Sequence, residues 1–121
     1  MRILAQQITY DNLNRLKKDD VIILLYNSGL GYSSNNSIFE RIWIGKYDNN
    51  YIRDYKYTSY SPFYNVFVEH VAIPCDYFGI VTNLDYTLLH ITDEHSIQLL
   101  NLVNNSKSMF KLINEIKIYE S

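Results

Sequence analysis

Side chains alternate with a period of two residues through the middle of the chain, which is the spacing of a β-strand. Residues 37–47, SIFERIWIGKY, follow this alternation, and residues 51–60, YIRDYKYTSY, follow it again after the turn sequence DNN. A continuous apolar run, VIILLY at 21–26, comes before them and indicates a strand buried on both faces. The pattern therefore predicts a buried strand followed by a β-hairpin.

Three later segments also predict strands. Residues 66–73, VFVEHVAI, form the fourth, which ends at Pro74 because proline cannot donate a ladder hydrogen bond. Residues 77–83, YFGIVTN, and residues 86–92, YTLLHIT, form the fifth and sixth.

A short helix is expected near the N-terminus, from about Tyr10 to Lys18. Leu13 and Leu16 fall on one of its faces. Thr9 or Asp11 can cap its first turn.

Helical spacing returns from Thr92 onward, and the sequence NNSKS divides the region into two helices. Thr92 or Asp93 is the expected N-cap. The apolar residues at this spacing are Ile97, Leu99, Leu100, Val103, Phe110, Leu112, Ile113 and Ile116. We expect this stripe to pack against the sheet.

Together these elements predict an α+β fold. It has a curved antiparallel sheet of five or six strands, or a small SH3- or OB-like barrel, with a short N-terminal helix and two C-terminal helices. The chain has 121 residues, of which 47% are hydrophobic and 20% charged, so we expect a single globular domain over residues 1–121.

Charge and cysteine content narrow the class of protein. The formal net charge of −2 lacks the basic excess that general nucleic-acid binding requires, so we do not expect such binding. The one cysteine, Cys75, excludes an internal disulfide framework. The longest apolar run, 21–26, is far shorter than the roughly 20 residues of a membrane helix, and MRILAQQ is too short for a signal-peptide core. We expect a cytoplasmic protein with no membrane partner, no cofactor and no metal.

Asn, Tyr, Ile and Lys are abundant in the chain, and Ala and Pro are scarce, which indicates a genome rich in AT codons, such as that of a low-GC bacterium or its phage. In the first half of the chain a helix is followed by a Gly/Ser loop and a strand ending in I-x-K. The residues that define this order are Leu16, Lys17, Asp20, Ile22, Gly29, Gly31, Ile44 and Lys46. The order resembles a diffuse pattern of small phage-encoded barrel proteins, and it includes no catalytic motif.

The segment LYNSGLGYSS, residues 25–34, holds two of the four glycines. A phosphate-binding loop needs its glycines to open a helix and to end in lysine, whereas this loop lacks the lysine and leads into a strand. We therefore expect a connection that uses glycine and asparagine to reach positive φ. If the loop has a function, it covers the hairpin, and Tyr26 and Tyr32 belong to the same surface.

The histidines are the second candidate for chemistry. His90, Asp93, Glu94 and His95 cluster where a strand meets a helix. The sequence HIT resembles half of the His-x-Thr pair of two-histidine phosphoesterases, but His70 does not begin a second such motif. We expect capping and surface roles for this cluster, and its catalytic alternative is a hydrolase acting on nucleotides or RNA through His90, His95 and Glu94.

Cys75 with His70 as its base is a further catalytic candidate. Residues five apart in a strand point to opposite faces, and Pro74 bends the chain between these two. We therefore interpret Cys75 as a buried thiol.

The hairpin is rich in aromatic residues and arginine. If its turn DNN contains three residues, Tyr47 faces Tyr51, Trp43 faces Tyr55 and Arg41 faces Tyr57. One sheet face then carries Arg41, Trp43, Tyr47, Tyr51, Arg53, Tyr55 and Tyr57. Such residues are enriched at binding hot spots, and they can also stack nucleobases.

A turn of two residues shifts the register by one, so that Ile42 and Ile44 join the tyrosines as core. The face is then an aromatic core rather than a surface. Alanine at Trp43 and Tyr55 separates the two cases, because a surface role predicts lost binding with an unchanged melting temperature, and a core role predicts a large loss of stability.

The leading hypothesis for function is a small non-catalytic binding protein, encoded by a phage or a mobile element. It binds a host protein or a nucleotide-like ligand through the aromatic and arginine face, and acts as an inhibitor or a sequestering factor. The alternatives are the hydrolase and a structural module that forms homo-oligomers through this face.

Overall fold

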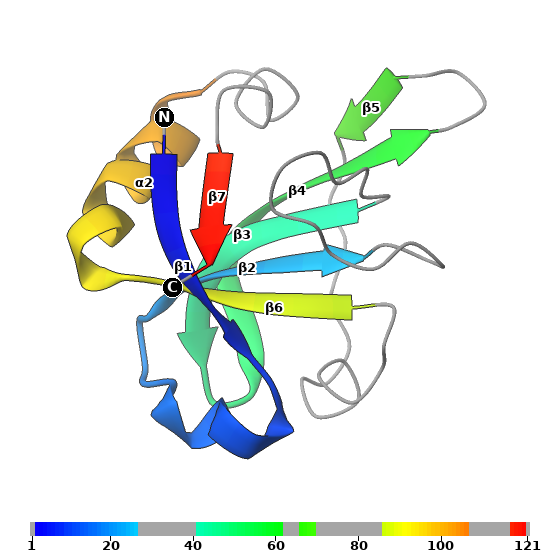
Figure 1. Cartoon of the computed structure of the whole chain (residues 1–121). Helices are drawn as coiled ribbons and strands as arrows, with labels where there is room; N and C mark the ends of the chain where they lie inside the picture. The colour runs from blue at the N-terminus through cyan, green and yellow to red at the C-terminus, as the bar shows by residue number, and fades with distance from the viewer. Residues whose placement is uncertain (1, 27–40, 62–65, 70–85, 107–116, 121) are drawn as a thin grey trace.

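The computed structural model describes residues 2–26, 41–61, 66–69, 86–106 and 117–120 (Figure 1). In chain order its elements are β1 (Arg2–Ile8), the 3₁₀-helix η1 (Tyr10–Arg15), β2 (Val21–Tyr26), β3 (Arg41–Asp48), β4 (Tyr51–Ser61), β5 (Val66–Glu69), β6 (Tyr86–Ile91), α2 (Asp93–Asn105) and β7 (Lys117–Glu120). The strands form one sheet in the order β5-β4-β3-β2-β6-β1-β7. All pairings are antiparallel except the parallel pairing of β1 with β7.

The fold is a mixed α+β arrangement, as the sequence predicts, but the described sheet is not a closed barrel. β5 and β7 lie at opposite ends of the strand order. The sheet is nevertheless strongly twisted, because β1 and β7 run steeply across the direction of β2 and β6 (Figure 1). The prediction of five or six strands omits β1 and β7.

β1 brings residues from the start of the described chain beside residues from its last strand. Its first half, Arg2 to Ala5, pairs in parallel with β7, and its second half, Ala5 to Ile8, pairs antiparallel with β6. Ile3 and Ala5 are fully buried, so this strand belongs to the core.

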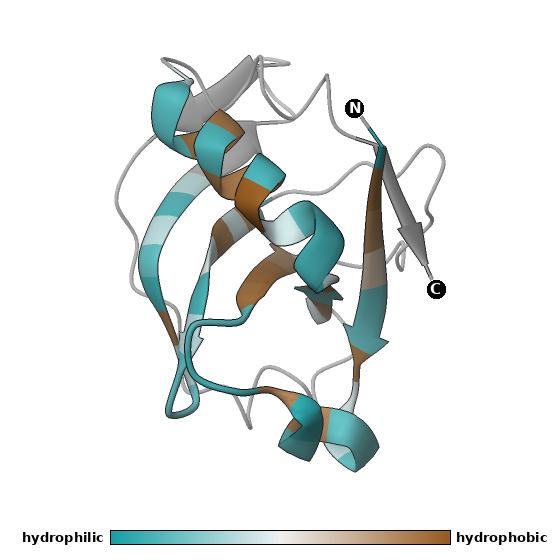
Figure 2. Cartoon of the chain, turned by 90° about the vertical axis from the view of Figure 1, so that its left-hand side faces the viewer, coloured by the Kyte–Doolittle hydropathy of each residue, from teal (hydrophilic) through white to brown (hydrophobic). Residues whose placement is uncertain are grey.

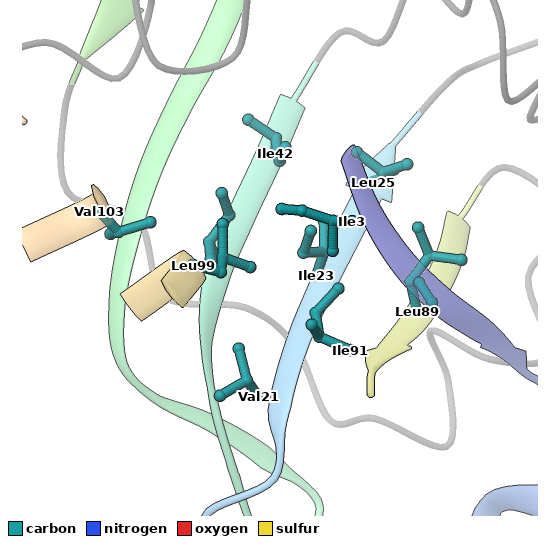
Figure 3. Packing of buried hydrophobic residues seen from close by; sticks show 11 residues of the cluster. Ile3, Val21, Ile23, Leu25, Ile42, Leu89, Ile91, Leu99 and Val103 are labelled. Atoms are coloured by element: carbon teal, nitrogen blue, oxygen red, sulfur yellow. The ribbon is translucent and has the colours of Figure 1, made fainter. Parts of the chain in front are cut away.

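One face of the sheet is covered by α2, which lies across it (Figure 2). Leu99 and Val103 of the helix are buried against alternate residues of four strands, including Ile23 of β2 and Ile42 of β3 (Figure 3). The remaining members of this core are Ile3, Ala5, Val21, Leu25, Ile44, Leu89 and Ile91. Leu99, Leu100 and Val103 of the predicted helical stripe therefore pack against the sheet, as expected, whereas Ile97 of the same stripe is 71% exposed and lies outside this core.

The opposite face has its own buried cluster. Leu13 and Leu16, in and next to η1, pack at one end of it. The other buried members are Ile8, Ile22, Leu24, Trp43, Ile52, Tyr57 and Leu88. Because both faces are covered, β2 is apolar at every position from Val21 to Leu25, and the prediction of a strand buried on both faces is confirmed.

The two predicted helical starts are confirmed in position. η1 begins after Thr9, whose backbone N–H donates to Asn12 Oδ1 at 2.6 Å, and α2 begins after Thr92. η1 ends at Arg15, which is earlier than expected.

At the C-terminal end, Lys117–Glu120 is the strand β7, so helix does not continue to the end of the chain. The predicted segments at 27–40, 77–83 and 107–116 lie outside the described residues, as do His70 and Cys75.

Candidate functional site

The β3–β4 hairpin, which carries the predicted site residues, turns through two residues rather than three. Asn49 and Asn50 both have positive φ, 46° and 71°, which is the geometry of a type I′ hairpin turn. Asp48 pairs with Tyr51, and Tyr47 pairs with Ile52. The predicted pairing of Tyr47 with Tyr51 is therefore wrong.

A β-bulge then changes the register again. Lys46 pairs with Arg53, but Ile44 pairs with Lys56, so two residues of β4 lie opposite the single residue Gly45. Asp54 takes up the extra residue with φ 51°. Beyond the bulge Trp43 pairs with Tyr57, rather than with Tyr55 as the three-residue turn predicts.

This register divides the predicted site residues between the two faces of the sheet. Arg41, Trp43, Tyr47, Tyr55 and Tyr57 share one face. Arg41 and Trp43 alternate with Ile42 and Ile44 of the α2 face, and Tyr47, Tyr55 and Tyr57 pack in the cluster that contains Trp43. Tyr51 and Arg53 flank Ile52, which pairs with Tyr47, so both lie on the opposite face of the sheet.

The Arg53 side chain also forms ion pairs with three carboxylates. Its guanidinium pairs with Asp19, with Asp48 at 3.2 Å and with Asp54 at 3.5 Å. These contacts tie the hairpin end to the turn before β2, which gives Arg53 a structural role.

Four rings form the centre of the remaining face, and we call them the aromatic cluster: Tyr26, Trp43, Tyr57 and Tyr86. The ring centroids of Trp43 and Tyr57 are 4.8 Å apart, as are those of Tyr26 and Tyr86, and Trp43 lies 6.4 Å from Tyr86. These are the separations of interacting aromatic pairs. Tyr86 was not among the residues predicted from sequence, since only the pairing of β6 with β2 brings it beside Tyr26.

The cluster has a buried centre and a half-exposed side. Trp43 is 4% exposed and Tyr57 is 7% exposed, whereas Tyr26 and Tyr86 are half-buried. Trp43 is therefore a core residue as well as a member of the predicted site.

Two polar groups belong to this cluster. The guanidinium of the exposed Arg41 lies over the Tyr26 ring, 5.2 Å from its centroid, in cation–π geometry. The indole Nε1 of Trp43 is buried, and no hydrogen-bond acceptor for it lies among the described residues.

Tyr47 and Tyr55 extend the same face toward the hairpin turn, and both are half-buried. Burial raises the pKa of the Tyr55 hydroxyl above its ordinary value. This hydroxyl is therefore neutral at physiological pH and remains a hydrogen-bond donor.

The histidine candidates separate in the structure. His95 Nδ1 accepts a hydrogen bond from the Leu4 backbone N–H at 3.1 Å, while the Thr92 N–H donates to Leu4 O at 3.1 Å. Both backbone groups of Leu4 are thus satisfied by the start of α2. His95 fastens β1 to the helix, and Glu94 is exposed in the first helical turn.

Replacing His95 by alanine will lower the free energy of unfolding by about 1–3 kcal/mol, because the partly buried Leu4 N–H loses its acceptor. Chemical denaturation measures this loss. His95→Asn is the control, since its side-chain oxygen can accept the same bond and should recover most of the stability. Equal stability of the wild type and both variants would contradict a structural role for His95.

His90 lies on the aromatic side of the sheet, at the other end of β6 from Tyr86. Its Nε2 is 3.5 Å from Asp20 Oδ2, and it makes no hydrogen bond with any described residue. Among the described residues, no contact joins the side chains of His90, Glu94 and His95, so the structure does not bring them together as one catalytic arrangement.

No protein-family model, curated protein or solved structure matches the chain. Within the described ranges, no helix has both the length and the apolar character needed to cross a membrane.

Proposed function

We propose that this chain is a small non-catalytic binding protein that uses the aromatic cluster and Arg41 to bind its partner. The observation that supports this most directly is the Arg41 guanidinium, which is exposed and stacked over the half-buried Tyr26 at 5.2 Å. Arg, Tyr and Trp are the residues enriched at binding hot spots, where rigid aromatic area is combined with a directed charge.

The half-buried rings of Tyr26 and Tyr86 support the same proposal, since their centroids lie 4.8 Å apart beside Arg41. A partner with an acidic group can pair with Arg41, while its flat groups stack on Tyr26 and Tyr86. Two kinds of partner have this chemistry: a segment of a host protein, and a nucleotide-like small molecule.

The biological role that we propose is inhibition or sequestration in the cytoplasm of a host cell, by a protein encoded by a phage or mobile element. It rests on composition and on the absence of a catalytic motif in the sequence. The binding role is favoured over the hydrolase alternative because His95 Nδ1 already accepts the Leu4 N–H.

Arg41→Glu tests the proposal. We expect it to weaken partner binding at least tenfold, which corresponds to about 1.4 kcal/mol, while the melting temperature stays nearly unchanged because Arg41 is exposed. Arg15→Glu is the matched control, since Arg15 is an exposed arginine at the far end of η1. Wild type and both variants are immobilised, and captured host proteins and nucleotides are identified by mass spectrometry.

Binding is then measured directly, by titrating each captured species against the protein. The chain has one tryptophan, so its fluorescence reports on Trp43 alone. A species that changes this fluorescence and loses affinity only with Arg41→Glu supports the proposal. Equal loss in both variants would mean a general charge effect. Concentration-dependent mass in light scattering, abolished by Arg41→Glu, would instead indicate the homo-oligomer alternative.

A further inference from the structure

Three potential metal ligands from distant parts of the sequence converge at the end of the sheet near the start of α2. They are Asp20, His90 and Asp93, and we call them the acid–histidine cluster. One ligand atom from each lies within 4.8 Å of the others. Asp20 lies just before β2, His90 in β6, and Asp93 is the first residue of α2.

Asp20 is held firmly in place. Its backbone oxygen accepts the Tyr47 N–H at 2.8 Å, and its carboxylate Oδ2 accepts the Lys17 N–H at 2.8 Å. The side chain is only 18% exposed. It therefore has little conformational freedom left to lose on binding an ion.

His90 and Asp93 are also attached to the scaffold. His90 pairs with Ile22 on one side and with Gln6 on the other, so it lies on an interior strand. The first turn of α2 is fixed to β1 through Thr92 and His95. Sites built on such elements are more exact in geometry than sites built on loops.

The distance between His90 Nε2 and Asp20 Oδ2 suits a shared metal ion. It is 3.5 Å, and Nε2 has no hydrogen-bond partner in the described part of the chain. Two ligands on a tetrahedral zinc ion, each about 2.0–2.1 Å from the metal, lie roughly 3.3 Å apart. The exposed Asp93 carboxylate has the freedom to move in by the remaining distance.

Charge also favours a cation. Among the described residues, no lysine or arginine side chain pairs with Asp20 or Asp93. Arg53 pairs instead with Asp19, Asp48 and Asp54. The carboxylates of Asp20 and Asp93 bring two formal negative charges into the cluster. A divalent cation relieves their repulsion.

We propose that the acid–histidine cluster binds one divalent transition-metal ion, Zn²⁺ by preference. Imidazole nitrogen favours zinc over magnesium and calcium, which take oxygen ligands. Three protein ligands leave a coordination position open to water or to an oxygen of a partner. The sequence alone predicts no metal, because Asp20 is 70 residues away from His90 in the chain.

The test is calorimetric titration of the apo chain with ZnCl₂, together with its melting temperature with and without zinc. We expect Asp93→Asn to weaken zinc binding roughly tenfold or more, and to abolish the zinc-dependent rise in melting temperature. Glu94→Gln is the matched control, since it removes the same charge from the same helical turn but lies outside the cluster. It should bind zinc like the wild type.

His90→Gln should weaken zinc binding as Asp93→Asn does. The titrations are repeated in a Cys75→Ser background, because a thiolate also binds zinc. Unchanged zinc affinity in Asp93→Asn, or equal loss in Glu94→Gln, would overturn the proposal. Magnesium binding as tight as zinc binding would overturn the choice of metal. Arg41→Glu should leave zinc affinity unchanged, so this site and the proposed partner site can fail separately.

Discussion

Replacing Trp43 by alanine will lower the free energy of unfolding by about 3–5 kcal/mol. Trp43 is 4% exposed, and its ring centroid lies 4.8 Å from that of Tyr57. It belongs to the cluster that covers the sheet opposite α2. Its removal leaves a cavity that the strand backbones cannot fill. Urea denaturation measures the effect as a lower midpoint with an unchanged m-value.

Trp43→Phe and Tyr51→Ala complete this experiment. Phenylalanine keeps one aromatic ring, and the Nε1–H that it removes has no acceptor among the described residues, so it should cost clearly less than alanine. Tyr51 is 52% exposed, and its replacement should change stability by less than about 0.5 kcal/mol. A Trp43→Ala variant as stable as the wild type would mean that the indole is a surface group, contrary to its burial here.

Replacing Gly45 by alanine is expected to destabilise the protein by about 1–3 kcal/mol. A Cβ at this position would lie 2.7 Å from Ile52 Cγ2, 2.8 Å from Arg53 O and 2.8 Å from Tyr55 Cβ. Two of these atoms are backbone or Cβ and cannot rotate away. Glycine in a strand is ordinarily less stable than alanine by roughly 0.5–1 kcal/mol, so the sign of the change tests the close packing of the bulge.

Asp54→Gly is the comparison from the other side of the bulge. Asp54 has φ 51°, where glycine meets no steric penalty, and its side chain is 71% exposed. The relief of strain and the extra chain entropy of glycine should nearly cancel, leaving stability within about 0.5 kcal/mol of the wild type. The same denaturation curves measure both variants. A Gly45→Ala variant more stable than the wild type would show that the strands can separate at the bulge.

The strands and helix starts with strong periodicity were predictable from the sequence. β2 was predictable because every residue from Val21 to Leu25 is apolar, and α2 because its buried residues recur at helical spacing. β1 was not, since the apolar residues of Arg2–Ile8 do not alternate regularly and the segment has two glutamines. Its strand state depends on β6 and β7, which lie far away in the sequence.

The residue types of the aromatic face were predictable, but their register was not. Both a two-residue and a three-residue turn fit DNN, and positive φ at Asn49 and Asn50 selects the shorter one. The bulge opposite Gly45 then adds a residue that alternation alone does not reveal. The two-residue turn moves Arg53 to the other face of the sheet, and the bulge places Trp43 beside Tyr57.

The position of β1 also has a consequence for the timing of folding during synthesis. Residues 2–8 are synthesised before the other described strands, but their partner strands are residues 86–91 and 117–120. The hairpin of β3 and β4 can form from neighbouring residues, whereas β1 must wait until nearly the whole described chain has been made. Of the described strands, β1 is thus synthesised earliest and is among the last to be paired, and until then its apolar residues are available to chaperones.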